Sequence, residues 1–152
     1  MNTKEVARLI EFSKVVREST LKRLKKLNFS TVNRSPKPGM MSFADIAGHL
    51  IDSDEWMIRK IKNKNLDPID GNPGSVIIRS EEQLNNLFAR LEKSLIDKCE
   101  FLGTLEDNVL EEKIYDSRFN GEVSVWWIIV RGNIDHEIHH RGQLAAYLSM
   151  MD

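Results

Sequence analysis

Apolar side chains recur every three or four residues along four stretches of the chain, which is the spacing of one face of an α-helix. The predicted helices span residues 3–28, 42–63, 80–103 and 124–150. Segments rich in proline, glycine and other turn formers separate them, such as residues 35–39, where two prolines prevent a helix from continuing. Four amphipathic helices joined by loops of this length predict an all-α fold, a four-helix bundle with at least one longer crossover.

The stretch before the last helix, residues 104–123, has no clear helical period. It contains Asn120-Gly121, a pair typical of the tight turn between two antiparallel strands. A short β-hairpin before the last helix is therefore an option within the bundle.

Two helix starts carry the spacing of a capping box, in which two side chains satisfy backbone N–H groups at a helix end. Asn2 with Glu5 has this spacing at the first helix, and Ser80 with Gln83 has it at the third. Ser42 is the expected cap of the second helix.

Length and composition describe one ordinary globular domain, residues 1–152. The chain is 41% apolar and 30% charged, and it is long enough to bury a core without disulfides. A formal charge of −1 gives no electrostatic footprint for nucleic acid or an anionic membrane. The longest wholly apolar run, residues 125–130, is far shorter than the roughly 20 residues of a membrane helix.

Two further features bear on location. The single cysteine, Cys99, cannot form an internal disulfide, which favours a reducing compartment. The charged N-terminal residues lack the apolar stretch of a signal peptide. We therefore expect a cytoplasmic protein.

The segment that carries chemistry lies in the last predicted helix. His136 and His140 are four residues apart, so their rings project from one face of a helix. That face also carries Leu144 and Tyr147, which marks it as the inward one. Two buried imidazoles are costly unless something satisfies their nitrogens, and a metal ion would do so. His139 points away from this line and is expected to face solvent or a neighbouring subunit.

His49 is the remaining histidine, and it borders the buried stripe of the second helix. If the second and last helices are neighbours, it completes a set of three. Catalytic zinc sites commonly keep three protein ligands and one open position. Nickel and iron also accept imidazole, so the histidines alone do not name the metal. The alternative is a set of ordinary packing contacts, which would equally explain the nearby Gly48, Gly132 and Gly142.

Two motifs resemble those of the DinB/YfiT-like family. Residues 136–144 (HEIHHRGQL), preceded by Trp126-Trp127, resemble its C-terminal motif, and residues 42–50 (SFADIAGHL) resemble its second-helix motif. The resemblance implies a bundle with one divalent metal ion, nickel or zinc and in some cases iron, held by His49, His136 and His140. It also implies a homodimer, because dimers are common in the family.

The resemblance further implies an activity. Characterised relatives include metal-dependent S-transferases that use a low-molecular-weight thiol such as bacillithiol, mycothiol or glutathione. We therefore predict a metal-dependent S-transferase that joins such a thiol to an electrophilic small-molecule substrate. One alternative is a metal-dependent hydrolase on the same scaffold, and another is a non-enzymatic metal-binding bundle related to stress. A fourth ligand from Asp45, Asp52 or Glu137 would favour the non-enzymatic alternative.

Several polar residues flank the three histidines and are candidates to orient their rings, because ligating imidazoles usually donate their second N–H to an oxygen. Helix-packing or surface contacts are the competing interpretation of each. The candidates are Asp45, Asp52, Asn133, Glu137 and Gln143.

Overall fold

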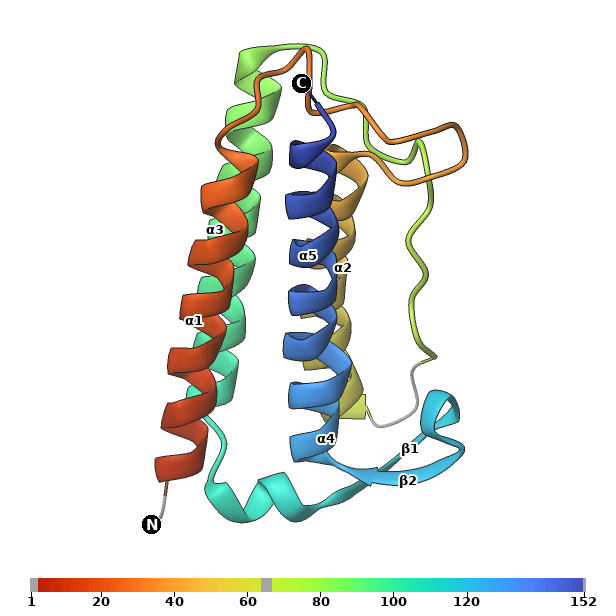
Figure 1. Ribbon diagram of the computed structural model, residues 1–152. Coiled ribbons are helices and arrows are strands. Elements are labelled where there is room, and N and C mark those ends of the chain that lie inside the picture. Colours follow the sequence, from red (N-terminus) through yellow and green to blue (C-terminus); the bar gives the residue numbers. More distant parts are fainter. Residues whose placement is uncertain (1–2, 64–66, 152) are drawn as a thin grey trace.

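Within the described residues, 3–63 and 67–151, the computed structural model is a helical bundle with one small hairpin, which confirms the predicted fold class (Figure 1). Long helices lie side by side, with α1 packed against α3 and α5, and α2 packed against the same two helices. The elements are α1 (Lys4–Leu24), α2 (Phe43–Asn63), α3 (Glu81–Gly103), α4 (Val125–Ile129) and α5 (Asp135–Ser149). None of these helices is long and apolar enough to cross a membrane.

The last predicted helix is divided by a feature that periodicity did not reveal. Helices α4 and α5 are joined without a break by a π-helical turn, Val130–Ile134. A π turn inserts one residue into the helix and rotates everything that follows it. Residues 125–130 are apolar on all sides, so the sequence pattern there does not reveal a change from the usual 3.6 residues per turn.

The hairpin before the last helix is present. Strand β1 (Lys113–Asp116) pairs antiparallel with β2 (Gly121–Ser124). The turn differs from the expected two-residue Asn-Gly turn, because a 3₁₀ turn, Ser117–Phe119, comes first. Asn120 then closes it in the left-handed conformation, with φ of 56°, which Asn tolerates better than most residues.

Helix starts are capped partly by local and partly by distant groups. Ser80 caps α3 as predicted, accepting a hydrogen bond from the Gln83 amide. Asn2 lies outside the described residues. The free amides of Glu5 and Val6 at the start of α1 donate instead to the carboxylate of Asp107, at 3.1 and 3.0 Å. That cap comes from a distant part of the chain, so no local pattern could have indicated it.

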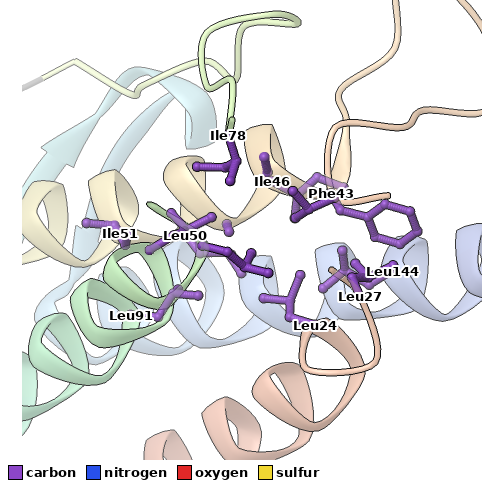
Figure 2. Packing of buried hydrophobic residues seen from close by; sticks show 14 of the residues in the cluster. Leu24, Leu27, Phe43, Ile46, Leu50, Ile51, Ile78, Leu91 and Leu144 are labelled. Atoms are coloured by element: carbon purple, nitrogen blue, oxygen red, sulfur yellow. The ribbon is translucent and has the colours of Figure 1, made fainter. Parts of the chain in front are cut away.

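The core consists of two apolar clusters stacked along the bundle. Figure 2 shows the one formed around Leu24, Phe43, Leu50, Leu91 and Leu144. The second lies toward the hairpin and is built around Val6, Met57, Leu102, Leu110 and Ile128. Every long helix contributes to both clusters, so every long helix also crosses the level between them.

That level is filled by buried polar groups, here called the polar layer. Its members are each less than a tenth exposed, and they come from all the long helices: Arg17 and Thr20 of α1, Asp54 of α2, Ser94 and Lys98 of α3, Asn133 of the π turn and Glu137 of α5. The four ionic members carry two positive and two negative charges. The layer is therefore neutral as a whole, which is the condition under which charges can be buried at tolerable cost.

Arg17 is the centre of this layer. Its guanidinium makes two hydrogen bonds to Glu137, from Nε at 2.9 Å and from Nη2 at 2.8 Å, and Nη2 also contacts Asp54 at 2.8 Å. Lys98 lies 3.1 Å from the other oxygen of Asp54. Burial alone would raise the pKa of Asp54, but Lys98 and Arg17 hold it below its usual value. The network therefore keeps the Asp54 carboxylate ionised and paired.

Replacing Arg17 with methionine should destabilise the fold by about 3–5 kcal/mol, because two buried carboxylates lose their main partner. The free energy of unfolding from urea titration monitored by circular dichroism measures this loss. Arg8→Met is the matched control, since Arg8 is exposed and forms a surface ion pair with Glu5 at 3.4 Å. Equal stability of the two variants would show that the polar layer is not a major stabilising element.

Candidate metal centre

Three histidines from two helices meet beside the polar layer. His49 projects from the middle of α2, and His136 and His140 lie one turn apart on α5. His136 Nε2 is 2.9 Å from His49 Nε2 and 3.0 Å from His140 Nε2. The second and last helices are thus neighbours, and the structure brings together all three histidines that the sequence analysis identified. Their service as metal ligands remains a prediction.

The donor set consists of imidazoles alone. One potential ligand atom from each histidine lies within 4.8 Å of the others, and no carboxylate or thiol among the described residues joins the group. A neutral imidazole has one N–H donor and one lone pair, so hydrogen bonds among the three rings cannot satisfy every lone pair. One cation would accept the lone pairs of all three. The residues present therefore fit a divalent ion of the kind that accepts imidazole.

Burial tunes the histidines for this role. His49 and His140 are buried, and His136 is half-buried. Burial is the first cause that lowers the pKa of each ring, and for His136 the neighbouring rings of His140 and His49 add to it and bring the pKa to about 3. All three rings are consequently neutral at pH 7. Neutral imidazole is the form that offers a lone pair to a metal.

Gln143 orients His140. Its Oε1 lies 2.7 Å from Nδ1 of the ring, and an amide oxygen can only accept, so Nδ1 carries the hydrogen. The opposite nitrogen, Nε2, then has its lone pair directed at the other two histidines. Gln143 is the one flanking candidate that contacts a histidine of the group through a hydrogen bond between described residues. Nδ1 of His136 is buried and has no partner among the described residues.

The other flanking candidates serve different purposes. Asp45 forms a capping box with Ser42 and accepts bonds from the amides of Gly74 and Val76, each at 2.9 Å. It therefore ties the loop before α3 to the start of α2. Asp52 is exposed, and its charge acts on His49 only from a distance. Helix capping and a surface position thus explain these two acids without a role as ligand.

Asn133 and Glu137 belong to the polar layer rather than to the histidine group. The Asn133 amide donates to Asp54 at 3.0 Å and accepts from Lys98 at the same distance. Sequence reasoning did not find the partners Arg17 and Lys98. The available signal was that both stand at helical spacing within apolar stripes, where a charge must have a buried partner.

Two of the three glycines near the histidines permit close packing. A Cβ at Gly132 would lie 3.2 Å from Nη2 of Arg118 and 3.4 Å from the Trp56 ring. A Cβ at Gly48 would lie 2.7 Å from Cγ2 of Val76. Gly142 has nothing within 4 Å of such an atom, so packing does not explain it. His139 is exposed, as expected.

Comparison with known proteins gives a consistent result. The sequence model of a family described as the DinB superfamily matches residues 14–144. A crystal structure of a DinB-like protein from Bacillus subtilis is similar to this chain, with 19% identity, a TM-score of 0.70, and coverage of 95% of this chain and 91% of that one. A conserved protein from Enterococcus faecalis is similar at 17% identity with a TM-score of 0.71, covering 97% and 95% of the two chains. No curated protein matches. At these identities the structural likeness concerns the fold.

A metal titration tests the histidine group. The untagged protein, dialysed against nickel or zinc and then freed of excess metal, should retain about one equivalent. His140→Ala should retain almost none, because the variant lacks one of the three imidazole ligands and two imidazoles hold a metal ion much more weakly. His139→Ala is the matched control, since it removes an exposed imidazole that lies edge-on to His140, with 5.1 Å between ring centroids, but is not one of the three candidate ligands. Equal retention by both variants would exclude the site.

The metal-free protein should lose stability on acidification. Unfolded histidine titrates near pH 6.5. Since the folded pKa of His136 is about 3, the unfolded state binds the proton first between these values, and stability falls as pH drops below about 6.5. His136 alone should account for about 1 kcal/mol between pH 7.5 and 5.5.

Urea unfolding in chelator at both pH values measures this dependence. His136→Gln should show a visibly smaller loss, because it removes the ring with the lowest pKa. An unchanged loss in that variant would contradict the assignment of the pH dependence to His136.

Proposed function

The chain belongs to the DinB superfamily, and from this membership and the geometry of its histidines we propose that it is a metal-dependent S-transferase. The enzyme would join a low-molecular-weight thiol to an electrophilic small molecule. His49, His136 and His140 would hold one divalent ion, with nickel or zinc favoured and iron also acceptable to imidazole.

The donor set is the observation that carries this proposal. Three neutral imidazoles contribute no negative charge, so an ion held by them keeps its full charge for an incoming ligand. A bound divalent ion would favour the thiolate form of a thiol over the thiol, and the thiolate is the nucleophile. Carboxylate ligands would weaken that effect, and none of the described carboxylates joins the group.

The chain's own residues would prepare the site in three ways. Burial keeps the rings of His49 and His140 neutral and unprotonated. Gln143 holds the His140 ring in one tautomer. His136 is only half-buried, which leaves a side of the group accessible to a small molecule.

The non-enzymatic alternative would be supported by a fourth protein ligand. The three acids considered for that position are engaged or placed elsewhere: Asp45 caps α2, Asp52 is exposed, and Glu137 binds Arg17. This distribution supports a site with an open position. Hydrolysis on the same site has no separate observation in its favour.

Two further parts of the proposal concern the setting. We infer a cytoplasmic protein from the single cysteine. We also infer a homodimer, to which the exposed apolar Phe12 and Val15 of α1 would contribute. Sedimentation velocity measures the assembly state directly.

A conjugation assay tests the activity. The nickel- or zinc-loaded protein should accelerate the reaction of at least one of bacillithiol, mycothiol or glutathione with 1-chloro-2,4-dinitrobenzene or monobromobimane. His140→Ala and the metal-free protein should lose at least about 90% of that acceleration, because the thiolate is no longer stabilised. His139→Ala should keep it.

Acceleration that is equal in wild type and His140→Ala would contradict the proposal. Metal-dependent cleavage of activated esters without any thiol conjugation would instead favour the hydrolase.

A further inference from the structure

Arg118 comes from the hairpin and lies against Trp56 of α2, the helix that carries His49, and against Gly132 of the π turn that precedes α5. It stands in the 3₁₀ turn between β1 and β2. Its guanidinium carbon is 4.5 Å from the centre of the Trp56 ring, and its Nη2 lies 3.2 Å from where a Cβ of Gly132 would be. Gly132 precedes His136 by about one helical turn. The hairpin thus places a cation between α2 and the π turn that precedes α5, near the helices that carry the histidines.

Burial and charge hold Arg118 in place. Asp116, which is fully buried, accepts hydrogen bonds from Nε and Nη2 of Arg118 at 3.2 and 3.3 Å. Lys60 lies 3.7 Å from the same carboxylate. One carboxylate is thus shared between two cations, and these three groups together carry one positive charge.

The guanidinium keeps donors that can bind a ligand. The Arg118 side chain is 33% exposed, and its Nη1 has no hydrogen-bond partner among the described residues. Stacking on Trp56 removes side-chain freedom before any ligand arrives, so binding costs less ordering.

We propose that Arg118 binds a carboxylate of the thiol substrate, next to the three histidines. This inference rests on the proposed function and narrows its substrate class to thiols with a carboxylate a few bonds from the sulfur. A guanidinium recognises a carboxylate by charge and by paired N–H donors, and a partly desolvated position strengthens that contact. The sulfur would be held at the histidine group and the carboxylate at Arg118, which fixes the thiol at two points.

Thiol binding to the cobalt-loaded protein provides a test that needs no turnover. The thiolate-to-cobalt absorption band gives dissociation constants for 3-mercaptopropionate and for its neutral amide, 3-mercaptopropionamide. The ratio of the two constants, amide over acid, should fall by about five- to tenfold in Arg118→Gln relative to wild type. Comparing ratios between proteins cancels the difference in basicity between the two thiols.

Arg131→Gln is the matched control. Arg131 also lies over an indole ring, 5.2 Å from that of Trp127, and pairs with Asp135 at 2.9 Å. It should keep the wild-type ratio. Arg118→Lys retains the charge opposite Asp116 and should give an intermediate ratio, because lysine lacks the paired donors. If Arg118→Gln fails to fold by circular dichroism, the ratios of wild type, Arg118→Lys and Arg131→Gln decide the question.

The outcomes separate this inference from the proposed function. If neither thiol produces the band, the proposed function fails and the inference fails with it. If both bind and the ratio is the same in every variant, the proposed binding of the thiol's carboxylate by Arg118 is overturned, and the proposed function stands. A carboxylate carried by the electrophile would also leave the thiol ratio unchanged. In that case propionate would alter the tryptophan fluorescence of the protein saturated with 2-mercaptoethanol, and Arg118→Gln would abolish this response.

Discussion

The paired charges around Arg17 are the constraint on which the rest of the bundle depends. An arginine with no exposed surface is tolerable only if each of its donors finds an acceptor, and here Glu137, Asp54 and the Leu91 carbonyl supply them. These acceptors come from three other helices. A shift or rotation of any one helix would leave a buried charge without its partner. The apolar clusters above and below supply non-directional packing, whereas this layer also requires particular partners within hydrogen-bond distance.

The polar layer fixes the rotation of α5 relative to its neighbours, and this rotation sets the positions of the histidines on that helix. Glu137 must face Arg17, so the preceding residue, His136, is turned by about 100° toward α2. His140 follows one turn later on the same side. The π turn just before α5 lets Asn133 reach the polar layer while Gly132 faces Trp56 and Arg118. The polar layer and the candidate metal centre therefore use different sides of the same helical segment. One side faces the centre of the bundle, and the other faces α2.

Electrostatics separates the two faces. Ionised groups in the polar layer are paired within it, so the layer is neutral toward its surroundings. The histidines next to it are neutral because burial disfavours their charged form. Close to them, the hairpin adds the partly exposed cation Arg118, held by the buried Asp116. A neutral donor set with a fixed cation nearby is suited to small anionic ligands.

Sequence by itself determined the features that depend on local periodicity. It located the long helices and the hairpin, and it put His136 and His140 on one inward face, because helical spacing alone sets which side chains align. His49 is 87 residues from His136 in the chain. The sequence could therefore predict that it joins the pair only on the condition that the second and last helices are neighbours. Tertiary structure also decided the partners of Arg17, the Asp107 cap of α1 and the bonds from Gly74 and Val76 to Asp45, since each is a contact between distant segments. The physical reason is that a buried charge needs a partner somewhere, and only the packed bundle decides which residue stands within reach.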